Sequence, residues 1–292
     1  MKIRYLLFAL LMFSVAGGNL NAQGLSDADL SDPLNPVSKP STVYFGLTVG
    51  YNKVMHNAEI KTFAQDVLCP AFEDGKANGF HAGGFYEQFI GEVGTAHSIV
   101  LRGLYNTFPT SFDKQGDKSL SRVVDPTKEP TDPDYLKEVY STIAHKNEIK
   151  YTAISAELMY KFRAYVIDEI GALVFTVGPS FDFIGTKTRN QSVSIVDPIY
   201  VQFWEDPTLP AGQKYSADKR SIIVYEGDIE NAQSLRFAIK AGVQLEIKLP
   251  GTPIDIIPGA FYNFAFTDVD ERDWKVNAIQ IGVDLRYGLK LF

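Results

Sequence analysis

The sequence of 292 residues contains a single cysteine, Cys69. It can therefore form no disulfide within the chain, and it lacks the cysteine pairs of common metal sites. Basic residues are also few, because 28 Lys and Arg stand against 35 Asp and Glu and leave a formal charge of -7. A nucleic-acid-binding protein needs a basic surface, so we do not expect nucleic acid as a partner.

Long apolar runs are missing after the N-terminus. Beyond it, no stretch reaches the roughly 18 apolar residues that a membrane helix needs. At the start, Lys2 and Arg4 precede an apolar run, and small residues follow it. This order predicts a signal peptide over residues 1–22, since the alternative, a membrane anchor, is too short for a hydrocarbon core of about 30 Å. An exported chain of this kind can cross a membrane only as a β-barrel.

The remaining chain shows a short linker and then alternation with a period of two. Residues 23–40 are rich in proline and lack periodicity, which predicts an N-terminal periplasmic linker. In the clearest alternating segment, Leu235, Ile239 and Val243 share one face while Arg236 and Lys240 share the other. Alternating segments occur at 43–52, about 79–90, 98–106, 153–162, 173–183, 235–248, 256–267 and 279–291.

We therefore predict an all-β domain over residues 41–292, an eight-stranded antiparallel up-and-down transmembrane β-barrel. A soluble lipocalin-like barrel would alternate as well, but its bulky apolar face would point inward. Eight strands enclose too little space for so many Phe, Leu, Ile and Tyr side chains. With the faces inverted, the bulky side chains contact lipid and the small or charged ones fill the lumen.

The connections between the segments differ in length. Long ones cover 53–78, 107–149 and 184–233, with a shorter one at 268–275, whereas 91–97, 164–170 and 249–254 are short. Outer-membrane barrels have long extracellular loops and short periplasmic turns, and an even number of strands puts both chain ends in the periplasm. We expect this orientation here.

Two short motifs and the chain end point to a known family. Gly-Phe-Tyr-Glu-Gln-Phe at 84–89, Ser-Ile-Val-Leu-Arg-Gly-Leu-Tyr at 98–105 and the final Leu291-Phe292 resemble the small outer-membrane β-barrel proteins of the OmpA/OmpX and PorT-like kind. The resemblance covers about 41–292. It implies a bacterial outer-membrane location, contact with outer-membrane lipid and lipopolysaccharide, and transient contact with the barrel-assembly machinery through the terminal aromatic residue. Tyr287 and Leu289 are out of step with Phe292, which departs from the family pattern.

The predicted lumen contains charges of both signs. A narrow interior requires such charges to pair, so we predict a neutralising network, with Arg102 and Glu157 as one pair on adjacent strands. A structural plug is favoured over a gated ion path because eight strands leave no open channel. The predicted members are Arg102, Glu157, Lys161, Asp182, Arg236, Lys240, Glu246, Asp284 and Arg286, with Lys248, Lys290 and Glu87 on the same phase.

The long connections contain two strand-like segments, 193–204 and 220–229, and we expect the neighbouring strands to continue outward there as a hairpin. Its aromatic residues could bind an extracellular protein or glycan, helped by strand addition at a free edge. Alternatively, they stabilise their own hairpin. The residues are Tyr200, Phe203, Trp204 and Tyr225. A short helix is predicted at 132–146, after an Asp cap.

The last outer loop is acidic. Asp268, Asp270 and Asp273 are weak candidates for a divalent cation, and a solvated acidic loop is the alternative. We expect no cofactor.

The four histidines do not suggest a catalytic group. His56 and His145 are expected in outer loops, His97 in a periplasmic turn and His81 near the end of the second strand. We therefore expect a non-enzymatic barrel with a structural or surface-interaction role. A lipid-modifying enzyme and a narrow pore remain as alternatives.

Overall fold

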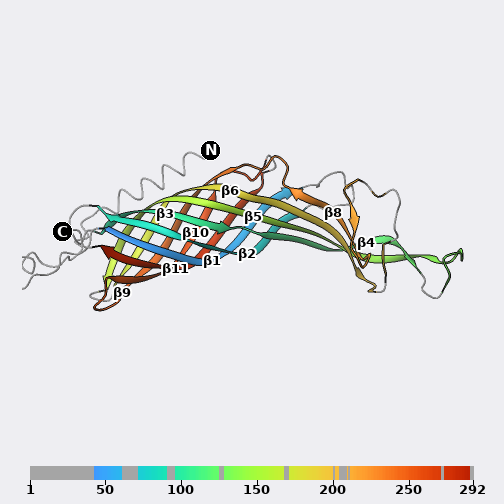
Figure 1. The fold of residues 1–292 in the computed structure, drawn as a ribbon, viewed down its shortest axis with the longest axis horizontal. Coiled ribbons are helices and arrows are strands. Elements are labelled where there is room, and N and C mark those ends of the chain that lie inside the picture. The colour runs from blue at the N-terminus through green and yellow to red at the C-terminus, as the bar shows by residue number, and fades with distance from the viewer. Residues whose placement is uncertain are drawn as a thin grey trace, which may run out of the picture.

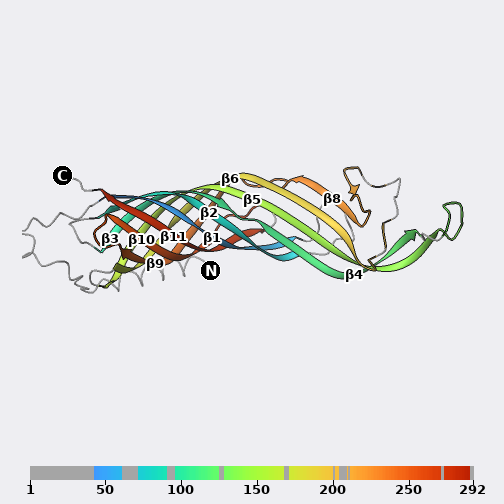
Figure 2. The same cartoon turned by 60° about the horizontal axis from the view of Figure 1, so that its bottom comes forward.

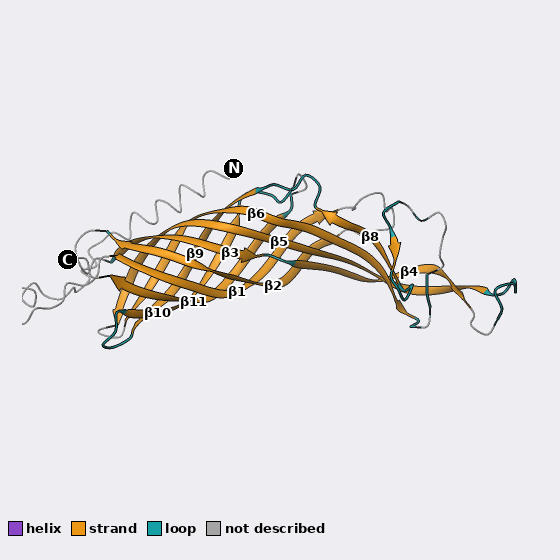
Figure 3. Ribbon diagram, viewed as in Figure 1, coloured by secondary structure: helices purple, strands orange, loops and turns teal. Residues whose placement is uncertain are grey.

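A computed structural model describes residues 43–60, 72–90, 96–124, 128–167, 171–199, 201–203, 209, 211–270 and 273–289. Within these ranges every regular element is a β-strand (Figure 3). No helix among the described residues is long and apolar enough to cross a membrane. The predicted signal peptide, the linker, Cys69 and the terminal Phe292 lie outside the described residues.

The strands are β1 (Val43–Ile60), β2 (Phe72–Phe89), β3 (His97–Thr107), β4 (Thr110–Val124), β5 (Leu136–Ile167), β6 (Gly171–Asp197), β7 (Lys214–Tyr215), β8 (Ser221–Asp228), β9 (Leu235–Lys248), β10 (Ile254–Ala265) and β11 (Lys275–Leu289).

A ring of eight of these strands forms a closed antiparallel barrel: β1, β2, β3, β5, β6, β9, β10 and β11 (Figure 1). The ring closes because β1 pairs with β11, from Val43 opposite Leu289 to Asn57 opposite Lys275. A closed ring leaves no unpaired strand edge in the membrane. The predicted eight-stranded up-and-down barrel is confirmed.

Short connections gather at one end of the barrel, which we call the turn end. They join β2 to β3, β5 to β6 and β9 to β10, as the sequence predicted. The other end carries long strands that project beyond the ring, and we call it the extension end (Figure 1). The described chain begins and finishes at the turn end, since Val43 pairs with Leu289 there.

The outward face of the barrel carries an apolar belt. Leu47 is 69% exposed and Ile154 is 65% exposed, whereas their inward neighbours Thr48 and Ser155 are buried. Such a pattern suits contact with hydrocarbon rather than water, so the barrel is a transmembrane one. The belt covers the outward positions of residues 45–51, 80–86, 99–105, 154–162, 173–183, 235–247, 254–266 and 279–289.

The inside-outside pattern reverses where the belt ends. On β1 the outward side chains are apolar up to Tyr51, and the next outward residue is Lys53. The inward side chains are small or polar up to Asn52, and the next inward residue is the fully buried Val54. The barrel therefore has a polar interior in the membrane and an apolar interior beyond it, as expected when the surrounding solvent changes from lipid to water.

The apolar interior directly beyond the belt forms one cluster, which we call the cap. It seals the barrel toward the extension end and draws residues from several strands and connections. Its buried members are Val54, Ala58, Phe72, Phe108, Phe112, Ile149, Tyr151, Ala153, Ile229, Val269, Trp274, Val276 and Ala278.

Beyond the ring, the ends of β5 and β6 form a twisted sheet with β4, β8 and the short β7, which we call the extension (Figure 2). β5 and β6 remain paired up to Thr142 opposite Asp197. β4 takes over from β3 alongside β5, after an interruption at Pro109, which has no N–H to donate to a ladder. On the other side, β8 pairs with β6 and takes the place of β9. The predicted outward hairpin is confirmed for β6 and β8, but its first strand ends at Asp197 rather than at residue 204.

Several details predicted from the sequence are wrong. Residues 132–146 do not form a helix, because 136–146 belong to β5 and pair with β4. The long connection 107–149 is largely strand, and 184–233 contains the end of β6 and all of β8. Likewise β1 extends to Ile60 and β2 begins at Phe72, which leaves only 61–71 between them. Mixed polar and apolar inward residues in these segments weaken the alternation that identifies a strand.

Candidate functional site

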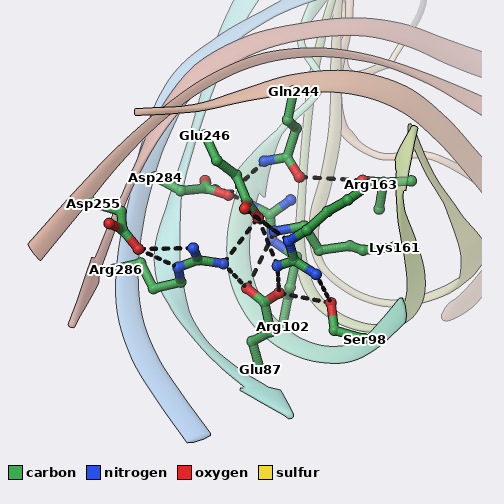
Figure 4. A network of polar contacts seen from close by, with 11 residues as sticks. Glu87, Ser98, Arg102, Lys161, Arg163, Gln244, Glu246, Asp255, Asp284 and Arg286 are labelled. Atoms are coloured by element: carbon green, nitrogen blue, oxygen red, sulfur yellow. Dashed lines mark hydrogen bonds and ion pairs between the residues drawn. The ribbon is translucent and has the colours of Figure 1, made fainter. Parts of the chain in front are cut away.

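The interior near the turn end contains a cluster of three carboxylates and three cations (Figure 4). Glu87 accepts hydrogen bonds from Ser98 Oγ at 2.7 Å, from Arg163 at 2.8 Å and from Arg286 at 2.9 Å. Lys161 Nζ lies 3.2 Å from the same carboxylate. Each of these four partners is a hydrogen-bond donor, so the Glu87 carboxylate is surrounded by donors.

Glu246 is the second anion of this cluster. It accepts from the same three cations, Lys161 at 3.1 Å, Arg163 at 2.8 and 2.9 Å, and Arg286 at 2.9 Å. Asp255 completes the set by accepting two hydrogen bonds from Arg286, at 2.7 and 3.0 Å. The three positive and three negative charges balance, which is the condition for burying them together.

The middle of the barrel contains two further ion pairs. Arg102 donates to Asp284 at 2.7 Å, and Lys240 donates to Glu157 at 2.9 and 3.1 Å. Gln244 also donates to Asp284 at 2.8 Å. The predicted partners Arg102 and Glu157 are opposite each other in register, but their Nε–Oε2 separation is 4.0 Å. Arg102 is thus paired mainly with Asp284, which lies across the lumen rather than on the adjacent strand.

A layer of neutral polar side chains lies next to these pairs, on the side of the extension end. Gln280 donates to Asn52 at 2.9 Å and to Asn106 at 3.0 Å. His81 Nδ1 is 2.8 Å from Asn52 Oδ1, and Asn106 donates to Ser155 at 2.8 Å. Carboxamides suit this position because each one both donates and accepts.

One more ion pair separates the amide layer from the cap. Arg236 donates to Asp182, to Asn263 at 2.6 Å and to the Val276 carbonyl at 2.8 Å. Its guanidinium also lies 4.8 Å from the Phe108 ring centroid. Arg236 therefore lies at the boundary between the charged interior and the apolar cap, with its guanidinium over the ring of Phe108.

The interior as a whole is filled and electrically neutral. Each of the ion pairs above is buried, and the cap closes the extension end. Breaking one such pair would leave a buried charge uncompensated, at a cost of about 3–5 kcal/mol. The arrangement fits a structural plug.

All nine predicted lumen residues face the interior. Arg163 and Asp255 are not among the residues predicted from the sequence, and Glu87 is predicted only as an addition to the nine. Arg163 continues the inward phase of Lys161, and Asp255 continues that of Gly259, so extending each alternating segment would have found both. Lys248 is exposed at the turn end, and Lys290 lies outside the described residues.

The predicted loop aromatics divide into two groups. Tyr200 and Trp204 lie outside the described residues. Phe203 packs against an apolar cluster that contains Ile143 and Ile195. Tyr225 donates to the Asp228 carbonyl at 2.6 Å, and the Arg189 guanidinium lies 4.1 Å from its ring. The two described aromatics thus contribute to the packing of the extension itself.

The acidic loop does not assemble a cation site from its described aspartates. Asp268 lies 3.8 Å from Lys275, and Asp270 is buried. Among the described residues, no group of three or more His, Cys, Asp or Glu side chains could hold a metal ion.

The histidines lie far apart, and two of the predicted positions are wrong. His56 and His145 belong to strands β1 and β5 and are buried, not in loops. His97 begins β3, and its Nδ1 lies 2.5 Å from the Tyr160 hydroxyl. His56 and His81 are both held inside the barrel by hydrogen bonds.

No family model matches this chain, and no curated protein matches its sequence. Solved outer-membrane barrels are similar in fold. Ail, the attachment invasion locus protein of Yersinia pestis, in complex with the heparin analogue sucrose octasulfate, shares 13% identity over 84% of this chain and 99% of its own, with a TM-score of 0.31. Neisserial surface protein A shares 10% identity over 84% and 97%, with a TM-score of 0.34.

A third similar structure is the translocator domain of the autotransporter NalP from Neisseria meningitidis. It shares 8% identity over 84% of this chain and 88% of its own, with a TM-score of 0.25. Similarity at this level carries no information on function, which has to come from the chain's own geometry.

Proposed function

We propose that this protein is a non-enzymatic surface protein of a bacterial outer membrane that presents the extension to partners outside the cell. The observation that carries the proposal is the exposure of two large apolar side chains beyond the end of the β5–β6 ladder, in the extension. Tyr140 is 74% exposed and Ile199 is 75% exposed, the highest values among the described large hydrophobic side chains.

Tyr140 lies on β5, and Ile199 lies in the turn that follows β6. Thr142 and Asp197 are paired at the end of the β5–β6 ladder, and Tyr140 and Ile199 each lie two residues beyond that pair. Both are far from the apolar belt, so lipid does not cover them. Exposed large apolar side chains that lipid does not cover, tyrosines above all, are typical of protein interfaces. We infer a protein partner for this tip.

The filled interior supports a binding role over the alternatives. A pore would need a continuous polar path, but the charged interior is followed by the cap. A lipid-modifying enzyme would need a nucleophile and a base within hydrogen-bond reach at the membrane surface. His56 and His81 are instead engaged by Trp274 and Asn52 inside the barrel.

Cells that display the protein can test this function through adhesion to a surface coated with serum proteins. We expect the double variant Tyr140→Ser, Ile199→Ser to reduce adhesion several-fold at an unchanged surface level. The control is Tyr165→Ser, which removes a tyrosine of similar exposure, 65%, at the turn end. Equal adhesion by the double variant and the wild type would refute the tip as the binding site.

A further inference from the structure

Two lysines are neighbours on the outer surface of the barrel, directly beyond the apolar belt. Lys53 is the next outward residue after Tyr51 on β1, and Lys76 lies on the outward face of β2. Asn78 is opposite Lys53 in the ladder, and Lys76 is two residues before Asn78. The lysines are thus diagonal neighbours on one face, with Cα atoms about 7–8 Å apart. Both side chains are exposed, so a molecule that surrounds the barrel at this depth meets them without any opening of the structure.

Neither lysine of this pair forms an ion pair with a residue in the described part of the chain. Asp74 lies one outward position beyond Lys76 on β2, but the two side chains do not pair. In the extension, by contrast, the exposed Lys146 and Lys214 each lie 2.6 Å from a glutamate carboxylate. Like charges that are neighbours across two strands destabilise a sheet. The lysine pair is therefore an attractive position for an anion from outside the chain.

The depth of the lysines in the membrane indicates which anion they meet. Tyr51 is opposite Phe80, and these are the last belt residues of β1 and β2. The Phe80 ring centroid lies 5.9 Å from that of Tyr105, so aromatic rings continue onto β3. Aromatic side chains gather where the hydrocarbon meets the headgroups. The lysines follow these rings at once and so reach the layer of the lipid phosphates.

A third donor lies next to the two ammonium groups. The Tyr51 hydroxyl donates a hydrogen bond to Asn78 Oδ1. This bond uses the acceptor of the carboxamide, so the group that Asn78 offers to a ligand is the donor Nδ2. Two ammonium groups and an amide N–H match a phosphate, which accepts hydrogen bonds at several oxygens and binds charged donors most strongly.

We propose that Lys53, Lys76 and Asn78 form a binding site for a lipid phosphate, and that the lipid is lipid A, the phosphorylated glycolipid that anchors lipopolysaccharide. The identity of the lipid rests on the proposed function, which puts the extension end and this site in the outer leaflet. The acyl chains of the same lipid have apolar surface to contact on the belt side of the lysines, where Leu47 and Val49 are exposed. The site fixes the depth at which the barrel holds the extension above the membrane.

The test uses the full-length protein in micelles of an uncharged detergent, titrated with lipid A that carries two phosphates, with the bound lipid counted by native mass spectrometry. We expect Lys53→Gln, Lys76→Gln to weaken binding at least tenfold, because both cations are removed. Lys53→Arg, Lys76→Arg keeps the charges and should bind as the wild type does. The matched control is Lys146→Gln, Lys214→Gln, which removes the same charge from the extension and should also leave binding unchanged.

Two further lipids identify the group that is recognised. Lipid A without its phosphates should bind the wild type no better than intact lipid A binds the glutamine variant, because the site contacts the phosphate. Phosphatidylglycerol carries a phosphate but belongs to the inner leaflet, and it should bind more weakly than lipid A. Phosphatidylglycerol binding that equals or exceeds that of lipid A would overturn the assignment to the outer-leaflet lipid.

Unchanged binding by the glutamine variant would overturn the site, as would a wild type that binds no lipid A. An equal loss in the control variant would also overturn it, because overall charge would then explain the attraction. Every variant should keep the wild-type unfolding temperature in detergent alone, since the changed side chains are exposed. The tip variant Tyr140→Ser, Ile199→Ser should keep full lipid A binding, which separates this inference from the proposed function.

Discussion

The indole Nε1 of Trp274 donates a hydrogen bond to Nδ1 of His56 at 3.0 Å, across the interior of the cap. Because Nδ1 accepts this bond, the ring proton is on Nε2, which donates to the Phe108 carbonyl at 3.0 Å. His56 is therefore held as a neutral imidazole with both nitrogens engaged. Protonation at Nδ1 would replace an acceptor by a donor that faces another donor.

This bond predicts acid sensitivity of the cap. His56 lies beyond the belt, and burial lowers its pKa from 6.5 to about 3, although the Phe108 hydrogen bond opposes the shift. The unfolded chain binds the proton first, so the contribution of His56 to stability is complete above pH 6.5. It is lost as the pH falls from 6.5 toward 3, by up to about 1.4 kcal/mol per pH unit.

Trp274 fluorescence in a Trp204→Phe background, followed through urea unfolding at several pH values, measures this loss. His56→Gln keeps polar atoms but does not titrate in this range, so its stability should depend less on pH between 6.5 and 4. The same slope in both proteins would show that other groups cause the acid sensitivity.

The Lys240–Glu157 pair predicts a cost that depends on which partner is removed. Glu157→Gln leaves a buried ammonium without its counterion and should destabilise the barrel by about 3–5 kcal/mol. The double variant Glu157→Gln, Lys240→Met removes the charge as well and should recover most of the loss. Urea unfolding in detergent micelles gives both values. A double variant as unstable as the single one would mean that the pair contributes through shape rather than charge.

The reversal along β1 predicts that an outward-facing lysine is costly within the belt and tolerated beyond it. Val49→Lys places a charge in the belt and should cost about 2–4 kcal/mol near the bilayer midplane. Met55→Lys, on the same outward face beyond Lys53, should change stability by less than about 0.5 kcal/mol. Equal costs at the two positions in liposome unfolding experiments would contradict the belt boundary.

The opposite faces of β9 provide an independent check. Ile239→Lys points into the belt and should again cost about 2–4 kcal/mol. The side chain of Gln244→Lys points into the lumen. There its ammonium can pair with Asp284, to which the native Gln244 amide donates at 2.8 Å. Its effect should be milder, and a larger loss than for Ile239→Lys would mean that the faces are assigned in reverse.

The filled interior predicts that the purified protein shows no steady conductance in planar lipid bilayers. Loss of the cap alone should not open a channel, because the ion pairs fill the lumen on the turn-end side of the cap. Trp274→Ala should therefore remain silent while losing about 3–5 kcal/mol of stability. A stable open channel in the wild type would contradict the plug.

Much of the barrel could be predicted from the sequence because its strands are surrounded by lipid. A strand such as β9 places Leu235, Ile239 and Val243 on one face without exception, and hydrocarbon tolerates no interruption. The opposite face of these strands carries the charged residues, so the sequence predicts Glu157, Lys240 and Asp284 in the lumen. Which cation meets which anion depends on long side chains crossing the lumen, so the Arg102–Asp284 pair had no sequence signal.

The extension was harder to predict because lipid does not surround it. Beyond the belt, water meets the outer face and the inner face mixes Ile143 and Ile149 with His145 and Asn147, so alternation becomes weak. The change at Asn52, Lys53 and Val54 is visible in the sequence as a reversal of phase. Following that reversal would have identified β1 as a strand that continues through the interface.

Labelling of intact cells tests the central claim most directly, namely that the extension is displayed outside the cell by a barrel in the outer membrane. Single cysteines at Tyr140 and Tyr165, introduced in a Cys69→Ser background, lie at opposite ends of β5 and are 74% and 65% exposed in the native protein. We predict that a membrane-impermeant maleimide labels Tyr140→Cys in intact cells and Tyr165→Cys only after the outer membrane is permeabilised. Labelling of Tyr165→Cys alone in intact cells would reverse the orientation, and recovery of both proteins in the soluble fraction would contradict the membrane barrel.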